Sequence, residues 1–185
     1  MWWIIAIVVI VIIVAIATTS SNGKKIDETI SNQNTYLQNN NVTKTADYQW
    51  RNIVNDTFYR FVVDDVNKKV HIGSGINSVY FKTFNYSDII GFEVIEDNVT
   101  VGGIKRAIAG GILAGGVGAI VGAATANKTA VSSYKAILYT QNISNPTYEM
   151  NLIKMKTKTT DSDYKTACDF TTKINGTIKA IMSKT

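Results

Sequence analysis

The sequence is poor in the side chains on which enzymes and metal proteins depend. Its 185 residues include one cysteine, Cys168, one histidine, His71, and one proline. A single cysteine excludes an internal disulfide framework and a cysteine-based zinc site. A single histidine excludes a multi-histidine metal centre, and a single proline excludes a proline-rich linker. We therefore expect no metal, no cofactor and no catalytic site.

Charge is also scarce, since charged residues make up 18% of the chain, against roughly 25% in typical soluble domains. Residues 1–23 and 107–127 contain no charged side chain at all. The formal net charge of +5 suits either nucleic acid or an anionic membrane surface. Because no block of basic residues is interleaved with aromatic ones, we expect membrane lipid and not nucleic acid as a partner.

The remaining ionisable residues form no catalytic constellation. His71 falls on an expected strand without a second histidine, so we interpret it as a wall residue with a solvent or backbone partner. Cys168 lies on an apolar helix stripe, which favours a buried and inert thiol. Glu93 and Glu96 lie three residues apart on a strand and point to opposite faces, so they are no acid–base pair.

The first 23 residues predict a transmembrane anchor. Residues 1–17 are apolar throughout, and a spanning helix needs about 20 such residues, with a lower limit near 17. Trp2 and Trp3 are suited to a membrane interface. Lys24 and Lys25 follow the apolar segment and no basic residue precedes it. The positive-inside rule therefore predicts a single-pass protein of the cell membrane with its domain in the cytoplasm.

The alternative is a cleaved signal peptide followed by export. Residues 15–17 read Ala-Ile-Ala, which fits the pattern of a cleavage site. A signal peptide begins with a basic region, however, and none precedes the apolar run, which is also longer than usual. We therefore predict an uncleaved anchor.

The rest of the chain divides into a linker and a strand-rich domain. Residues 24–57 are expected to form a polar linker, because residues 31–45 contain few large apolar side chains. A short helix over residues 25–37 is an alternative for its first part, although its pattern is weak. From residue 58 onward, short apolar runs alternate with turn residues, which is typical of strands. The expected strands are about seven in number, at residues 58–63, 69–72, 79–82, 92–96, 99–101, 134–140 and 148–153.

The chain ends in an amphipathic helix. Apolar residues recur there at steps of three and four and form one stripe: Tyr164, Ala167, Cys168, Thr171, Ile174, Ile178, Ile181 and Met182. About seven strands followed by one helix predict an α+β fold that is mainly β. An antiparallel sheet of this size closes or stacks to hide its edges, and a helix stripe fills the remaining opening.

Two segments resemble the PH/GRAM-like fold, FVVDDVNKKVHI and YSDIIGFEVIEDN, together with the terminal helix. The resemblance implies an antiparallel barrel with a C-terminal capping helix over residues 58–185. The whole chain also resembles a family of small proteins from Gram-positive bacteria and their prophages. In that family a DI-x-x-FE strand precedes a GGxxxGGVGAIVGA segment, and the chain ends in a helix. This second resemblance implies fold and context, and no chemistry.

Residues 104–128 form a glycine-rich insertion between two expected strands, and we expect its ends to lie close together. Small residues recur every four positions in two adjacent rows: Gly110, Ala114, Gly118 and Gly122, and Gly111, Gly115, Ala119 and Ala123. On a helix, these rows form a smooth face that another helix can approach closely, as in a glycine zipper.

Three structures fit this insertion: a membrane helix or re-entrant hairpin, a packed helical hairpin, or a flexible loop. Glycine costs about 1 kcal/mol per helix position relative to alanine, but the segment is too apolar for a free loop. A second full span would place the flanking strands on opposite sides of the membrane, which conflicts with a single barrel. Membrane contact and packing against protein alone stay as open alternatives.

Two functions are compatible with these patterns. The first is a non-enzymatic, membrane-tethered binding or regulatory module at the inner face of the cell membrane. Its partners are membrane lipid and a protein partner or a second copy bound through the glycine segment. In a prophage setting, the resemblance implies superinfection exclusion or host-membrane defence. The alternative is a membrane-active effector whose glycine segment inserts into the bilayer and perturbs it. Lys154, Lys156 and Lys158 form either a solvated rim or an anionic-lipid contact.

Overall fold

The computed structural model of the chain describes residues 2–52, 55–105 and 128–184, with the side chains of α1 described at residues 3, 7–9, 11 and from 23 onward. The helices in this part of the chain are α1 (Trp2–Asn39), the 3₁₀ helix η1 (Tyr86–Asp88) and α2 (Ser162–Ser183). The strands are β1 (Ala46–Asn52), β2 (Thr57–Asp64), β3 (Lys69–Ser74), β4 (Phe81–Asn85), β5 (Ile89–Glu96), β6 (Val99–Lys105), β7 (Ala130–Val131), β8 (Tyr134–Thr140), β9 (Thr147–Ile153) and β10 (Thr157–Lys158).

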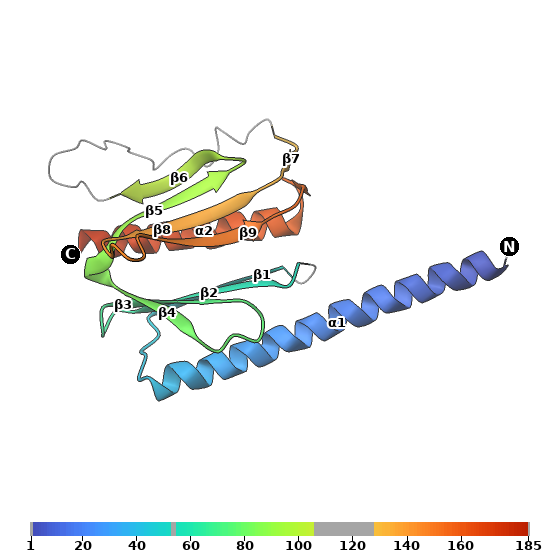
Figure 1. Cartoon of the computed structure of the whole chain (residues 1–185), viewed down its shortest axis with the longest axis horizontal. Helices are drawn as coiled ribbons and strands as arrows, with labels where there is room; N and C mark the ends of the chain where they lie inside the picture. Colours follow the sequence, from blue (N-terminus) through green and yellow to red (C-terminus); the bar gives the residue numbers. More distant parts are fainter. Residues whose placement is uncertain (1, 53–54, 106–127, 185) are drawn as a thin grey trace.

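The strands form two four-stranded antiparallel sheets, with strand orders β1-β2-β3-β4 and β6-β5-β8-β9, and a small β10-β7 pair. The two sheets lie one above the other in Figure 1, and α2 runs along them. Contacts join α2 to β1 in the first sheet and to β5, β6 and β9 in the second. This arrangement confirms a mainly β fold with a C-terminal helix, as in a PH-like domain.

The core lies where the inner faces of the two sheets meet α2. Strand β3 shows how the sequence builds it: Val70 and Ile72 are buried in the core, whereas Lys69 and His71 lie on the opposite face. In α2 the seven buried residues recur at helical spacing: Tyr164, Ala167, Phe170, Thr171, Ile174, Ile178 and Ile181. Six of the eight residues predicted for the stripe are therefore buried, Phe170 joins them, and Cys168 and Met182 are half-buried beside the core.

The segment expected to be a polar linker, residues 24–57, contains regular structure. Its first part belongs to α1, and residues 46–52 form β1, which pairs with β2 from Ala46↔Val63 to Asn52↔Thr57. Strand β1 buries Trp50, which is 2% exposed. The sequence of β1 has too few apolar residues to indicate a strand. Its position is determined by backbone hydrogen bonds to the apolar strand β2.

Strand β6 also runs further than expected, because it passes through Gly102 and Gly103 instead of ending before them. Gly103 has φ +153°, and a Cβ atom there would lie 2.5 Å from the Phe92 carbonyl oxygen. Gly103 therefore permits a close approach of β6 to β5.

Helix α1 is one continuous helix of 38 residues. Its C-terminal part lies along the outer face of the first sheet, and its N-terminal part projects well beyond the domain (Figure 1). Trp3, in the projecting part, is 67% exposed. No helix in the described part of the chain is long and apolar enough to cross a membrane, so the predicted transmembrane anchor is not found there.

Candidate functional site

The contact between α1 and the first sheet determines how the N-terminal part of the helix is held. Four α1 side chains are at most 1% exposed: Ile26, Thr29, Gln33 and Leu37. They recur at steps of three and four residues, so they form one face of the helix. Leu37 packs with Val62 of β2 and Phe81 of β4. Two of these side chains are apolar and two are polar, so burial of apolar surface is only part of what holds this face.

Hydrogen bonds complete the contact. The Gln33 Nε2 donates to the carbonyl oxygen of Ser78 at 3.0 Å, and the Thr29 hydroxyl accepts from the Asn77 N–H at 2.8 Å. Gly73 of β3 makes room for Gln33, because a Cβ atom there would lie 2.8 Å from Gln33 Nε2. The absence of a side chain on β3 therefore permits the close approach of α1.

A buried arginine adds charged hydrogen bonds to this contact. Arg60 of β2 is 1% exposed. Its Nε and Nη2 donate to the Asp47 carboxylate at 2.9 and 2.6 Å, and Nη2 also donates to Asn34 Oδ1 at 2.7 Å. Burial alone would raise the pKa of Asp47, but the hydrogen bond and charge of Arg60 outweigh it, and the pKa is lowered. Arg60 therefore joins α1, β1 and β2 through one charged network.

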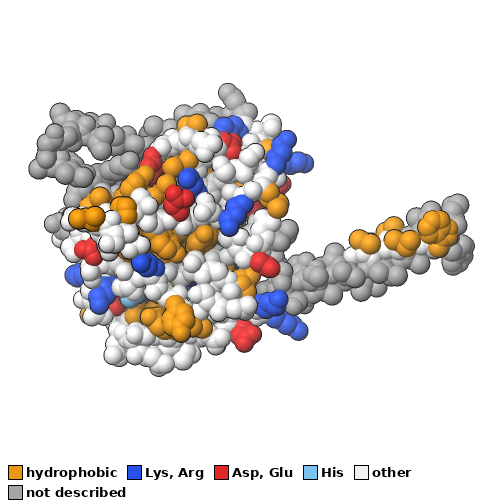
Figure 2. Space-filling view, in the orientation of Figure 1, with side chains coloured by type: hydrophobic (Ala, Val, Ile, Leu, Met, Phe, Trp, Pro, Cys, Tyr) orange, Lys and Arg blue, Asp and Glu red, His pale blue; other side chains and the backbone are white. Residues whose placement is uncertain are grey.

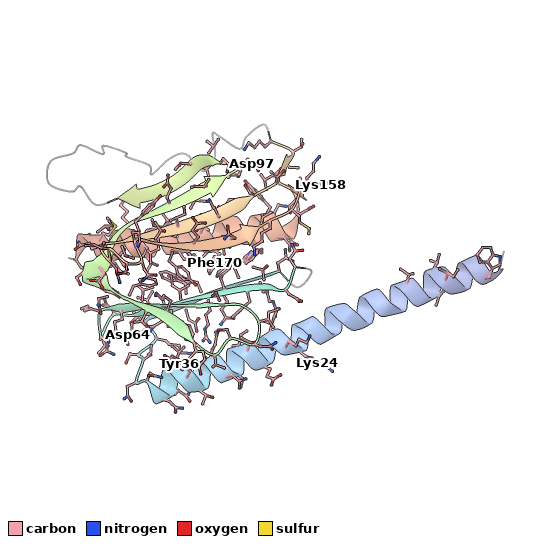
Figure 3. All side chains as sticks on the ribbon, viewed as in Figure 1. Lys24, Tyr36, Asp64, Asp97, Lys158 and Phe170 are labelled. Carbon is pink, nitrogen blue, oxygen red and sulfur yellow. The ribbon has the colours of Figure 1, made fainter. Side chains whose placement is uncertain are left out.

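The end of the domain from which the N-terminal part of α1 projects is rich in lysine. Lys24 on α1 and Lys158 on β10 both lie toward this end (Figure 3), and basic side chains are visible there in Figure 2. Arg51 at the end of β1 lies 3.6 Å from Asp27 of α1. Lys24, Lys25, Lys154, Lys156 and Lys158 are all exposed. The projecting part of α1 therefore leaves the domain at this lysine-rich end.

The two flanks of the glycine-rich segment lie toward opposite ends of β5. Lys105 pairs with Gly91, near the start of β5, whereas the Lys128 side chain reaches Glu96, at its end. Five residue steps along a strand separate the two positions, or about 17 Å. The expectation that the ends lie close together is therefore wrong, because β6 extends the chain along β5 from Glu96 back to Gly91 before the segment begins.

An ion-pair network fixes the chain where it returns from the glycine-rich segment. The Lys128 ammonium lies 3.1 Å from Glu96 Oε1 and 3.3 Å from Asp97 Oδ2, and Glu96 is fully buried. The Tyr164 hydroxyl of α2 donates to Glu96 Oε2 at 2.9 Å. The bond to Glu96 raises the pKa of Lys128, which keeps it charged. A buried carboxylate is thus compensated by a residue next to the segment.

Comparison with known protein families identifies the fold. Residues 45–154 match the family of PH domains that contain a glycine zipper. The chain belongs to this family. The match begins just before β1 and ends just after β9, so it covers both sheets and the glycine-rich segment that follows β6, but neither α1 nor α2. No curated protein and no solved structure matches the chain.

The residues singled out in the sequence of this glycine-zipper PH domain lie in two places. Trp2, Trp3, Lys24 and Lys25 belong to α1, where Trp3 and both lysines are exposed. The predicted helix-packing face lies outside the described residues: Gly110, Ala114, Gly118, Gly122, Gly111 and Gly115. The docking residues Gln33, Arg60 and Gly73 were not predicted. An arginine within the otherwise apolar run FYRFVV was the one local signal of a buried ion pair.

The described residues contain no group of three or more metal-ligating side chains. His71 is 5% exposed, and its Nδ1 lies 2.9 Å from the Thr83 hydroxyl, a side-chain partner instead of the solvent or backbone partner expected. Cys168 is half-buried, and burial raises the pKa of its thiol, which lowers its reactivity. A PH-like domain with a glycine zipper fits a non-enzymatic binding module.

Proposed function

We propose that this PH domain is a non-enzymatic binding module that α1 holds at the cytoplasmic face of a cell membrane. The observation that carries the proposal is the continuity of α1, which passes from its exposed N-terminal part into the docked part without a break. Its described apolar side chains near the N-terminus are 46% to 67% exposed: Trp3, Ile7, Val8, Val9 and Val11. Exposed apolar side chains grouped in this way mark an interaction site.

The docking of α1 would orient the domain relative to the membrane. A flexible spacer would let the domain rotate, whereas a helix packed by Gln33 and held by Arg60 points its lysine-rich end toward the membrane. A basic residue close to an anionic surface contributes about 1 kcal/mol of attraction. Anionic lipid is therefore the partner that we propose for this end, with Lys154, Lys156 and Lys158 as its contacts.

The glycine-rich segment supplies a second binding element in this proposal. Its two rows of small residues favour close helix packing, so we propose that it binds a protein partner or a second copy of the chain. The flanks of the segment are fixed to β5, through strand pairing at Lys105 and the ion pairs of Lys128. Superinfection exclusion or host-membrane defence is the setting proposed from the resemblance to prophage proteins.

Flotation of the full chain with vesicles tests the proposal. We expect it to rise with neutral vesicles and more completely with vesicles that contain phosphatidylserine. Val11→Asp places a charge on the exposed apolar part of α1 and should abolish flotation. The triple variant K154Q/K156Q/K158Q should lose only the preference for anionic lipid, because the apolar part of α1 is intact.

The control is K82Q/K173Q/K179Q, which removes the same charge from exposed lysines of β4 and α2. We expect this variant to keep the preference for phosphatidylserine. Wild-type protein that stays with the unbound fraction at both lipid compositions would contradict the proposal. Release of a trapped dye on binding would instead favour the membrane-active alternative.

A further inference from the structure

The structure contains a small polar cavity that is unrelated to the lysine-rich end. It has a volume of about 230 Å³ and lies where the last turn of α1 meets the β2–β3 turn and strands β3 and β4. Its lining includes Asn40, Asn41, Asn67, Lys69, His71 and Thr83. Sites for drug-sized ligands measure about 300–1,000 Å³. The cavity therefore suits a smaller molecule and excludes an intact lipid.

His71 is the first sign that this cavity is a binding site. Its Nδ1 lies 2.9 Å from the Thr83 hydroxyl, whereas its Nε2 is buried and has no hydrogen-bond partner within the part of the chain that the structure describes. A buried polar atom without a partner destabilises the folded state, because it has lost its bonds to water. A ligand atom that bonds to Nε2 would remove this destabilisation.

The charges around the cavity indicate the ligand's chemistry. Lys69 lies two residues before His71 on the same face of β3, and none of the described carboxylates lies within ion-pair distance of it. The nearby Asp64 carboxylate already accepts from the Asn67 N–H at 2.9 Å, the Asn67 side chain at 2.7 Å and the Thr43 N–H at 3.2 Å. The cavity therefore offers donors to a ligand, and its own carboxylate is already occupied.

We propose that this cavity binds a small oxyanion, a carboxylate or a phosphate, through Lys69 and His71. The groups that face His71 are Asp64 of β2, Lys69 of β3, Thr83 of β4 and the Tyr36 end of α1. Burial lowers the pKa of His71, so the empty site holds a neutral imidazole near neutral pH. An anion stabilises the charged imidazole, and binding strengthens as the pH falls.

Binding at this cavity is linked to the docking of α1. Part of the wall comes from the end of α1 and the residues that follow it, Asn40, Asn41 and Val42. A ligand that requires this wall stabilises the docked helix by the same free energy that docking contributes to ligand affinity. The bound oxyanion therefore stabilises the docked position of α1. It has no role at the lysine-rich end.

The single histidine of the chain makes the test direct, because every imidazole signal in an NMR spectrum belongs to His71. The full chain, labelled at histidine and held in lipid nanodiscs, is titrated with inorganic phosphate and separately with succinate. We expect a saturable shift of the His71 signals in the millimolar range. Lys69→Gln should weaken binding about tenfold, because it removes a charge-assisted bond. Lys82→Gln, on the neighbouring β4, should leave it unchanged.

The succinate titration also tests the pH dependence, because carboxylates stay ionised from about pH 6 to pH 8. Tighter binding at the lower pH supports the role of His71. A shift with only one of the two anions identifies which chemistry the site prefers. No saturable shift with either anion would overturn the proposal, as would equal affinity of wild type and Lys69→Gln. Neither result bears on vesicle flotation, which depends on other residues.

Discussion

The two long helices of this PH domain pack against the same sandwich in different ways. Helix α2 buries seven residues along one stripe, six of them apolar or aromatic, in the space between the sheets. The docked part of α1, by contrast, buries two apolar and two polar side chains on an outer face. It relies on hydrogen bonds of Thr29 and Gln33 and on the buried Arg60.

Helix α2 is thus part of the hydrophobic core, whereas α1 is docked on the outside of a sheet. Burial of apolar surface contributes roughly 25 cal/mol per Å² without directional requirements, so the α2 contact tolerates small movements. The α1 contact depends on bonds that fail together when the helix shifts, because polar groups left buried without partners are costly. We therefore expect α1 to detach from the domain under conditions in which α2 and the two sheets stay folded.

The largest effect is expected from truncation inside the α2 contact. Ile174 is fully buried, and Ile174→Ala should lower the free energy of unfolding by about 2–5 kcal/mol, measured by urea denaturation. Ile26 of α1 is equally buried. Ile26→Ala should have a smaller effect on global unfolding but speed amide exchange in residues 26–37. Equal losses of global stability would show that α1 and the sandwich unfold as one unit.

A somewhat smaller effect is expected from the buried charge. Arg60→Met removes the buried cation that pairs with Asp47 at 2.6 Å and the donor that bonds to Asn34 at 2.7 Å. Only the longer contacts of the exposed Lys44 then remain, 3.7 Å to Asp47 and 3.4 Å to Asn34. Breaking a buried pair costs about 3–5 kcal/mol, and we expect the lower end because the Asp47 side chain is 23% exposed.

The matched control for this variant is Arg51→Met, which removes an exposed pair with Asp27 at 3.6 Å. Such pairs contribute about 0–1 kcal/mol, so its melting temperature should stay near that of wild type. If both arginine variants melt alike, Arg60 does not hold α1.

Replacing two glycines by alanine should change the stability of the protein in opposite directions. In Gly73→Ala, the new Cβ would lie 2.8 Å from Gln33 Nε2 and 3.1 Å from the Phe81 ring, so the Gln33 amide must move away from its bond with Ser78. Overpacking of this kind costs about 1–3 kcal/mol. Gly176→Ala in α2 meets nothing within 4 Å and should stabilise the helix by up to about 1 kcal/mol. Thermal melts that show stabilisation by Gly73→Ala would contradict the close approach of α1 to β3.

The smallest expected effect is a dependence on acid. Because the pKa of Asp47 is lowered in the folded state, its contribution is present above the unfolded pKa, near 3.9, and is lost as the pH falls through the folded value. Amide exchange in residues 26–37, corrected for the intrinsic rate at each pH, should therefore rise below about pH 4 before the sheets unfold. In Arg60→Met this rise should become smaller, since the main cation that lowers the pKa of Asp47 is gone and Lys44, at 3.7 Å, remains.

The sequence by itself determined the elements whose side chains repeat with a regular period. Strands β2, β3, β5, β8 and β9 and helix α2 all lie within a few residues of their predicted positions. The stripe of α2 was readable because every third or fourth residue is apolar, and Val70 and Ile72 of β3 alternate with outward-facing residues. An element that buries one face against the core thus has apolar residues at a regular spacing, and this spacing can be found in the sequence.

Only the tertiary structure decided how α1 and β1 are placed and how the cavity beside His71 is formed. Helix α1 docks through pairs that are 45 and 26 residues apart, Gln33 with Ser78 and Asn34 with Arg60. Strand β1 pairs through its backbone, and the cavity beside His71 is formed by segments of α1, β2, β3 and β4. A hydrogen bond between distant residues needs one suitable atom on each side and imposes no period on either segment. For that reason the contact that orients α1 is absent from any local pattern.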